Sequence, residues 1–431
     1  MPTNLSRRHT RVCVVVTSAC AVGVLVGCST TTSTSVTSGT PVTSTSTDGP
    51  SATTSRSSPP PTTAPPSTSS APTATPSTSA AEPTQSCAET LVNRMSREQR
   101  VGQLFMVGLS AGAGPSSLDA ILRDQHVGGV VLLGTWTGSA SVAAATTHLQ
   151  EVAKASAGIR VLVSADQEGG QVQHLRGNGF TGAPAALTQG RDPAAAGGTA
   201  ARTGRELAAA GVNVDLAPVA DVVAAGFARQ NAPIGAYQRE FGNDPATVSR
   251  AVTAVVAGLQ GSGVSATLKH FPGLGRVTGN TDFTTVGTTD EVTTATDAWL
   301  QPFRDGIAAG TDLVMVSSAL YPRIDRTNRA VFSTAVIDGV LRGNLGYAGV
   351  VVTDDVGAAR AVAAVPVDER ATRFIAAGGD VVLTGLASTV PPMATAVSQR
   401  AADDATFAAQ VDASVHRVMA LKVKRGLATC S

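Results

Sequence analysis

Aromatic and charged residues are both scarce in this chain. Of its 431 residues, 3% are aromatic and 15% are charged, and the formal net charge at pH 7 is +1. Because there is no large basic or acidic surplus, we expect no nucleic-acid partner and no strong attraction of cations. Two Trp and three Tyr also argue against a long open groove in which polysaccharide rings stack on aromatic side chains. A small neutral partner fits these numbers better.

The apolar segment near the N-terminus is also short for a transmembrane helix. A basic region at residues 7–11 precedes an apolar stretch at residues 12–26, which is short for a span and typical of an export signal. The stretch leads into Cys28 through Leu-Val-Gly, which resembles a bacterial lipobox. We therefore predict a lipoprotein signal peptide at 1–28, a lipid on Cys28 and an exported, lipid-anchored protein at the cell membrane facing the cell wall. An uncleaved or ordinary signal peptide is the alternative.

The next segment lacks apolar residues. Residues 29–86 are almost entirely Ser, Thr, Pro, Ala and Gly, a composition that cannot offset the entropy of ordering, so we predict a disordered tether. Of the five cysteines, two leave with the signal and Cys28 would carry the lipid, which leaves Cys87 and Cys430. In an oxidising exterior we expect these two to form a disulfide that ties together the ends of a folded domain at 87–431.

Within this domain, short apolar runs alternate with longer segments of helical period, the pattern of repeated βα units in an α/β protein. The predicted strands are residues 103–109, 129–133, 160–165, 212–217, 264–269, 312–316, 349–353 and 380–383. The predicted helices are residues 115–124, 140–155, 195–210, 246–260, 290–309, 334–342, 368–377 and about 404–425. Eight such units predict a single (β/α)8 TIM-type barrel, and an open doubly wound sheet is the alternative.

Charged residues follow four of the predicted strands. Asp166 follows the third, Asp221 the fourth, and Asp354 the seventh, while Lys269 and His270 close the fifth. In a barrel of this kind the C-terminal ends of the strands meet at one mouth, where catalytic groups lie. Any one of the acids alone could instead cap the next helix. Their joint placement favours a site.

Residues 340–354, with the sequence VLRGNLGYAGVVVTD, resemble the active-site signature of glycoside hydrolase family 3, and the similarity extends from about Met95 to Leu427. Within that family the chain looks like the bacterial single-domain β-N-acetylhexosaminidases. The resemblance implies that Asp354 is a nucleophile that forms a glycosyl-enzyme intermediate. Asp355 is then expected to cap or orient its neighbour.

Three more segments carry the resemblance. Residues 164–174 are similar to the segment that binds the outer hydroxyls of the terminal sugar, which implies Asp166 as an acceptor; His174, where the family usually has Arg, is either a sugar contact or a surface residue. Arg239, in the sequence REFG, is implied as a sugar contact. Lys269 and His270, in the sequence KHFPG, are implied as donors to sugar hydroxyls. A salt bridge from Lys269 to Asp166 or Asp221 is compatible with that role.

One difference from the subfamily's sequence pattern affects the residue expected to act as the acid/base. The subfamily normally carries Asp-Ser-His on a mobile loop, and its His is the acid/base, but the corresponding residues here are Asn280, Thr281 and Asp282. Either Asp282 is the acid/base, which requires a raised pKa, or catalysis is weak and another group protonates the leaving oxygen. His270 has no second His or Cys at ligand spacing, so we expect no metal, and no cofactor.

The resemblance implies a retaining exo-β-N-acetylglucosaminidase that acts on terminal β-linked N-acetylglucosamine, with peptidoglycan (muropeptide) fragments as the expected substrate. We expect a monomer whose partners are a small saccharide and, through the lipid, the membrane. A β-glucosidase of the same family is an alternative, disfavoured because the second domain common in such enzymes is missing. A sugar-binding cell-envelope lipoprotein that has lost its acid is the alternative from another class.

Overall fold

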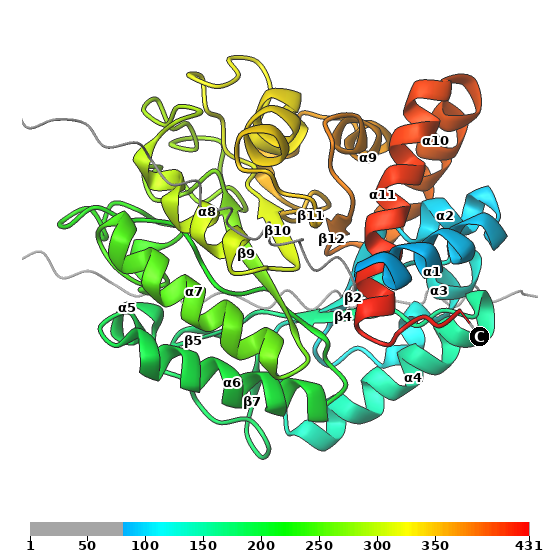
Figure 1. Cartoon of the computed structure of the whole chain (residues 1–431), viewed down its shortest axis with the longest axis horizontal. Coiled ribbons are helices and arrows are strands. Elements are labelled where there is room, and N and C mark those ends of the chain that lie inside the picture. The colour runs from blue at the N-terminus through cyan, green and yellow to red at the C-terminus, as the bar shows by residue number, and fades with distance from the viewer. Residues whose placement is uncertain (1–80, 431) are drawn as a thin grey trace, which may run out of the picture. The chain divides into compact units, whose positions relative to one another are not determined.

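The computed structural model describes residues 81–430, and a closed barrel of eight parallel strands lies at the centre of this part of the chain (Figure 1). The strands are β1 (Phe105–Ser110), β2 (Gly129–Leu133), β4 (Leu162–Ala165), β8 (Val214–Asp215), β9 (Ser265–Phe271), β10 (Leu313–Val316), β11 (Val350–Thr353) and β12 (Val382–Thr384). Each pairs with its neighbour in chain order, and β1 pairs with β12. A parallel bridge between Val352 and Val381 closes the ring. The predicted barrel is therefore confirmed.

Helices surround the barrel (Figure 1). They are α3 (Asp119–Asp124), α4 (Ser139–Ala157), α5 (Ala186–Gln189), α6 (Pro193–Ala209), α7 (Pro245–Gly261), α8 (Gln301–Ala308), α9 (Val367–Ala376), α10 (Val390–Asp403) and α11 (Ala405–Lys424), preceded by α1 (Ala81–Arg94) and α2 (Arg97–Gly102). Residues Ala335–Asn344 form a π-helix. Helices α1, α2, α5 and α10 were not predicted, and α1 begins at Ala81, before the predicted boundary at residue 86.

The predicted helix at residues 290–309 is wrong in its first part. Its 3₁₀ turn and helix begin only at Ala298. The carboxylate of Asp290 accepts hydrogen bonds from the backbone N–H groups of Val292 and Thr293, at 2.8 and 2.9 Å, and from the Thr293 hydroxyl at 2.6 Å. These local bonds satisfy the backbone in a turn, so they compete with the helix that the sequence pattern suggested.

Local signals in the sequence explain where α6 and α7 begin. Each helix has an Asp as its N-cap and a Pro as its first residue, and the Asp192 and Asp244 carboxylates accept backbone hydrogen bonds at 3.1 and 2.9 Å. A side-chain acceptor and a preset φ both favour the first turn of a helix. The two helices then pack against each other with small residues at their contact, including Gly258 opposite Gly197.

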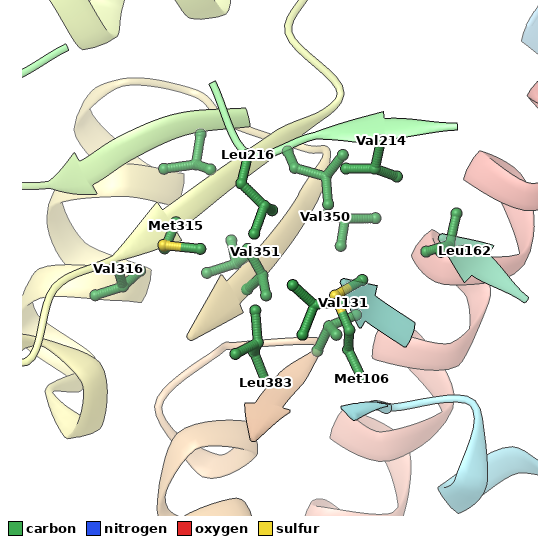
Figure 2. Packing of buried hydrophobic residues seen from close by; sticks show 14 of the residues in the cluster. Met106, Val131, Leu162, Val214, Leu216, Met315, Val316, Val350, Val351 and Leu383 are labelled. Atoms are coloured by element: carbon green, nitrogen blue, oxygen red, sulfur yellow. The ribbon is translucent and has the colours of Figure 1, made fainter. Parts of the chain in front are cut away.

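Apolar side chains fill the barrel interior. Figure 2 shows Met106 of β1, Val131 of β2, Leu216, Met315 of β10 and Leu383 of β12 gathered between the strands. All five are at most 5% exposed. Because aromatics are scarce, this interior depends on aliphatic and Met side chains, as the composition predicts. It forms a solid base beneath the C-terminal ends of the strands.

The two ends of the described chain are joined at the end of the barrel opposite the C-terminal ends of its strands. Helix α1 lies beside α11 (Figure 1), and a disulfide joins Cys87 to Cys430 with their Cα atoms 5.6 Å apart. A basal hollow of about 740 Å³ is lined by Ala88 of α1, by Asp312 just before β10 and by Val350, the first residue of β11. Helix α1 therefore lies at the N-terminal face of the barrel.

The predicted signal peptide, the predicted lipidation site Cys28 and all but the end of the predicted tether lie outside the described residues. Within residues 81–430, no helix is both long enough and apolar enough to cross a membrane.

Candidate active site

A pocket of about 410 Å³ opens at the C-terminal ends of the barrel strands. Its base is formed by Val131, Leu216, Met315 and Leu383, which belong to the barrel interior of Figure 2. Its polar walls contain Asp166, His174, Arg239, Lys269, His270, Asp282, Asp354 and Asp355. All seven residues predicted as catalytic or sugar-binding therefore line one pocket, together with Asp355.

Two carboxylates and two cations form a continuous network on one wall of the pocket. The Lys269 ammonium lies 2.6 Å from Asp166 Oδ1 and 2.7 Å from Glu168 Oε1. Arg239 donates to both oxygens of Glu168, at 2.7 and 2.9 Å, and to the Pro233 carbonyl oxygen at 2.8 Å. Such charge-assisted, partly bidentate bonds hold side chains in fixed orientations. Glu168 thus joins the two cations that face the pocket.

This network keeps its members charged in spite of their burial. Burial alone would raise the pKa of Glu168, but Arg239 and Lys269 outweigh it and lower that pKa to about 2. Burial would likewise lower the pKa of Lys269, yet Asp166 and Glu168 raise it. The pKa of Asp166 is lowered by Lys269 and His174 against the effect of burial. At neutral pH this wall therefore presents fixed charges to a hydroxylated ligand.

A second pair orients His270. The Asp221 carboxylate lies 2.8 Å from His270 Nδ1, and it also accepts the backbone N–H groups of His270 and Leu274 at 3.2 and 2.7 Å. In the neutral ring, Nδ1–H donates to Asp221 and Nε2 is an acceptor, 3.4 Å from Arg239 Nη2. Asp221, which is fully buried, fixes the ring but does not line the pocket. A sugar hydroxyl that reaches Nε2 of the neutral ring would donate to it.

Asp354 and Asp355 follow β11 and differ in their partners. The backbone of Asp354 extends the barrel ladder by donating to the Val316 carbonyl oxygen at 3.1 Å. Its Oδ1 accepts the N–H of Asp355 at 2.9 Å, and the side chain is otherwise directed to the pocket that it lines. Asp355 Oδ1 accepts three backbone N–H groups, from Gly357, Ala358 and Gly385, at 2.7 to 3.3 Å. These bonds give Asp355 a loop-organising role, whereas Asp354 Oδ2 has no such partner.

The loop that carries Asp282 is bound to the segment after β11. The N–H groups of Arg360 and Ala361 donate to the carbonyl oxygens of Asp282 and Thr281, at 3.1 and 3.0 Å. The Asn280 side chain accepts the N–H of Asp282 at 2.8 Å, a local turn that Asn commonly forms. These contacts place the Asp282 carboxyl on the same pocket wall as Asp354.

Asp282 has the titration behaviour that an acid/base needs. Partial burial, and then the negative charges of Asp354 and Asp355, raise its pKa to about 7, although Arg239 opposes the shift. Part of residue Asp282 is nevertheless exposed at the pocket mouth, so water still reaches it. A bound ligand would displace that water and disfavour the charged form further. A carboxyl that titrates near neutral pH can both donate and accept a proton.

Several contributors were missed from the sequence. Glu168 was given no role, because its partner Arg239 lies far along the chain. Asp221 was predicted as a strand-end acid and a possible partner of Lys269, but the structure pairs it with His270, while Lys269 binds Asp166 and Glu168. Asp215, buried below the pocket, accepts the Gln167 N–H at 3.1 Å, and burial raises its pKa to about 8. Its position at the end of β8 was the one available signal.

His174 lines the pocket with its Nδ1 3.9 Å from Asp166 Oδ2, and that buried nitrogen has no hydrogen-bond partner among residues 81–430. No cluster of three or more His, Cys, Asp or Glu within residues 81–430 could hold a metal ion.

Comparisons with known proteins agree with this geometry. A model of the glycosyl hydrolase family 3 N-terminal domain matches residues 96–421. A beta-hexosaminidase of Xanthomonas oryzae pv. oryzae is 38% identical over 289 residues, which are 64% of this chain and 82% of the relative. A solved β-N-acetylhexosaminidase from Beutenbergia cavernae is 46% identical, with a TM-score of 0.73, over 76% of this chain and 99% of that one. A family 3 β-N-acetylglucosaminidase from Paenibacillus sp. is 32% identical, with a TM-score of 0.71, over 77% and 63%.

A barrel with these charged groups at its strand ends, and with these relatives, is a glycoside hydrolase, an enzyme that acts on O-glycosyl bonds. The chain belongs to glycosyl hydrolase family 3.

Proposed function

We propose that this protein is a retaining exo-β-N-acetylglucosaminidase. The observation that carries the proposal is the placement of two carboxyl groups with different properties, Asp354 and Asp282, on one pocket with the charged network of Asp166, Lys269 and Arg239. The names of the relatives support the sugar, since the Xanthomonas and Beutenbergia proteins are a beta-hexosaminidase and a β-N-acetylhexosaminidase. A pocket that is closed at its base by the barrel interior suits a terminal sugar better than the interior of a polymer.

The reaction would proceed in two steps. Asp354 attacks the anomeric carbon and forms a C–O bond to it, while the bond to the leaving oxygen breaks and protonated Asp282 gives that oxygen its proton. Asp282 is then a carboxylate, and it removes a proton from water as the water oxygen attacks the same carbon. That attack releases Asp354, returns the proton to Asp282 and retains the anomeric configuration. The network around Glu168 and Asp166 would hold the sugar hydroxyls throughout.

The setting of the reaction belongs to the same proposal. Export and a lipid on Cys28 would place the enzyme at the cell membrane facing the wall, where peptidoglycan (muropeptide) fragments supply terminal N-acetylglucosamine. A single chain supplies every residue proposed for the site, which supports a monomer.

The test compares two aryl glycosides and one substitution in the full chain. We expect release from the aryl β-N-acetylglucosaminide but not from the matching β-glucoside. Asp354→Asn should lower kcat by about 10³-fold or more, because the mutant retains the shape of the pocket but lacks the attacking carboxylate. Asp403→Asn, at an exposed position at the end of α10, is the matched control and should keep wild-type activity. Full activity in Asp354→Asn would rule out this nucleophile.

A further inference from the structure

A long loop carries the proposed acid. This Asp282 loop spans residues 272–297, between β9 and the 3₁₀ turn that begins at Ala298, and it contains neither a helix nor a strand longer than a single bridge. Asp282 lies near its middle, at the pocket mouth. Long loops without secondary structure of their own commonly have a functional role in a compact domain. The position of the Asp282 carboxyl therefore depends on the contacts that hold the two ends of the loop.

The two ends of the Asp282 loop meet at Arg276. Its guanidinium donates to both carboxylate oxygens of Asp297, at 2.9 and 3.0 Å, and to the Thr293 hydroxyl. The same group lies over the Trp299 ring, with its Cζ 3.9 Å from the ring centroid. Arg276 and Asp297 are 21 positions apart in the sequence, so their contact closes the loop. We call the cluster of Arg276, Thr293, Asp297 and Trp299 the loop neck.

The loop neck is continuous with well-held structure on both sides. The Asp297 carboxylate accepts the Trp299 N–H at 2.8 Å and so begins the turn that leads into α8. On the other side, the amide of the fully buried Asn231 donates to the carbonyl oxygens of Leu274 and Val277, at 2.7 and 2.8 Å. Arg276 lies between these two carbonyl groups in the chain, so its backbone is fixed as well.

The ion pair in the loop neck is shielded from solvent. The side chains of Arg276 and Asp297 are 18% and 11% exposed. Burial would raise the pKa of Asp297, but the hydrogen bonds from Arg276 and from the Trp299 N–H outweigh it and lower that pKa. Salt screens such a pair less than an exposed one, and both partners stay charged at neutral pH. The loop neck is therefore a firm closure and not an ordinary surface contact.

We propose that Arg276 is a positioning residue for the hydrolysis: it closes the loop neck and so holds the Asp282 carboxyl where it can give its proton to the leaving oxygen. The inference rests on the proposed function, in which Asp282 is the acid/base. Arg276 does not line the pocket, so it acts through the loop and not on the substrate. A planar guanidinium binds a carboxylate at two points and stacks on an indole ring, which the ammonium of Lys reproduces only in part.

The test separates protonation of the leaving group from other defects. It uses two β-N-acetylglucosaminides with the full chain, one of 2,4-dinitrophenol, whose anion leaves without a proton, and one of phenol, whose oxygen needs one. Arg276→Gln should lower kcat/KM by about 10- to 100-fold for the phenyl substrate and by about threefold at most for the dinitrophenyl substrate, because a displaced acid slows only the step that uses its proton. A merely structural role would lower both values equally. Equal losses, or wild-type values for both substrates, would overturn the inference.

Three further variants complete this experiment. Arg276→Lys should recover part of the loss for the phenyl substrate, since it keeps the charge but not the two-point contact. Asp297→Asn keeps the size of the side chain but removes the charge that Arg276 binds, so it should cause the same selective loss; this variant decides the question if Arg276→Gln does not fold. Arg304→Gln removes an exposed arginine on α8 that belongs to neither the loop neck nor the pocket, and it should keep both wild-type values.

A double variant shows whether Arg276 acts through Asp282. In the Asp282→Asn background, Arg276→Gln should add less than about a threefold loss for the phenyl substrate, because the group that it positions is already missing. A larger additional loss would contradict this route. Selective loss in Asp282→Asn but in neither Arg276→Gln nor Asp297→Asn would overturn the inference alone. No hydrolysis of either substrate by the wild type would overturn the proposed function and the inference with it.

Discussion

Two lysines show how the partners of a buried group decide its charge. Lys269 and Lys422 are both at most 1% exposed. The Lys422 ammonium donates to the neutral Gln103 amide, and burial lowers its pKa to about 7, whereas two carboxylates raise the pKa of Lys269. Burial disfavours a charge in both cases, and only opposite charges close by reverse the outcome. Lys269, which faces the pocket, is therefore charged over the whole physiological pH range.

The raised pKa of Asp282 predicts the alkaline limb of the pH profile. The carboxyl must be protonated to act as an acid, so kcat/KM should fall as the pH rises through about 7. Asp282→Asn should remove this limb and lower turnover of an unactivated disaccharide by about 10² to 10⁴-fold. An aryl glycoside with a good leaving group should lose less, because its leaving oxygen needs less protonation.

Glu291→Gln is the matched control for this experiment. Glu291 is an exposed carboxylate nine residues after Asp282 that does not line the pocket, so its loss should leave the profile unchanged. A disaccharide rate that survives in Asp282→Asn would show that another group supplies the proton.

Among single residues, the sequence indicated most of the site, but of its internal pairs it suggested only the salt bridge of Lys269 with Asp166. Asp166, Lys269 and Asp354 could be predicted because they end strands, and a barrel brings strand ends together. The roles of Glu168 and Asp221 could not be predicted. Each depends on a partner from another strand or loop, at a distance that only the folded barrel sets.

The existence of a helix or strand follows from the periodicity of its apolar residues. Where it begins and ends depends on local hydrogen bonds that compete with it. All eight strands lie where the apolar runs predicted them. The start of α8 was misplaced because Asp290 can bond to its own backbone, and periodicity does not detect such a turn. The short helix α2 is too brief to show a period, although Ser96 and Gln99 form a capping box at its start.

The contact between α6 and α7 gives a prediction for stability. A Cβ on Gly258 would lie 2.4 Å from the Gly197 carbonyl oxygen, so neither helix can keep its position when Ala is introduced. Gly258→Ala should lower the free energy of unfolding by about 1–3 kcal/mol in spite of the better helix propensity of Ala. Gly198→Ala, in α6 with no heavy atom within 4 Å of the added Cβ, should raise it by about 0.5–1 kcal/mol. Urea unfolding of both variants gives the comparison, and equal effects would contradict the close packing.

At the scale of the molecule, the disulfide between Cys87 and Cys430 encloses almost the whole described domain, with a sequence separation of 343. A cross-link over so long a loop removes much of the freedom of the unfolded chain. Replacing both cysteines by Ala should therefore lower the free energy of unfolding by about 2–5 kcal/mol, with kcat almost unchanged because the pocket lies at the other end of the barrel. Chemical denaturation measures the loss, and the wild type in reductant should match the variant. A change below about 1 kcal/mol would mean that the packing of α1 on α11 is sufficient by itself.

The disulfide also marks the face of the barrel at which the described chain begins and ends. Helix α1 enters at the N-terminal face of the barrel, beside the basal hollow, whereas the pocket opens at the C-terminal face. The described chain therefore begins and ends on the face opposite the pocket mouth. A saccharide that enters the pocket meets the loops at the strand ends, among them the Asp282 loop, and neither end of the described chain.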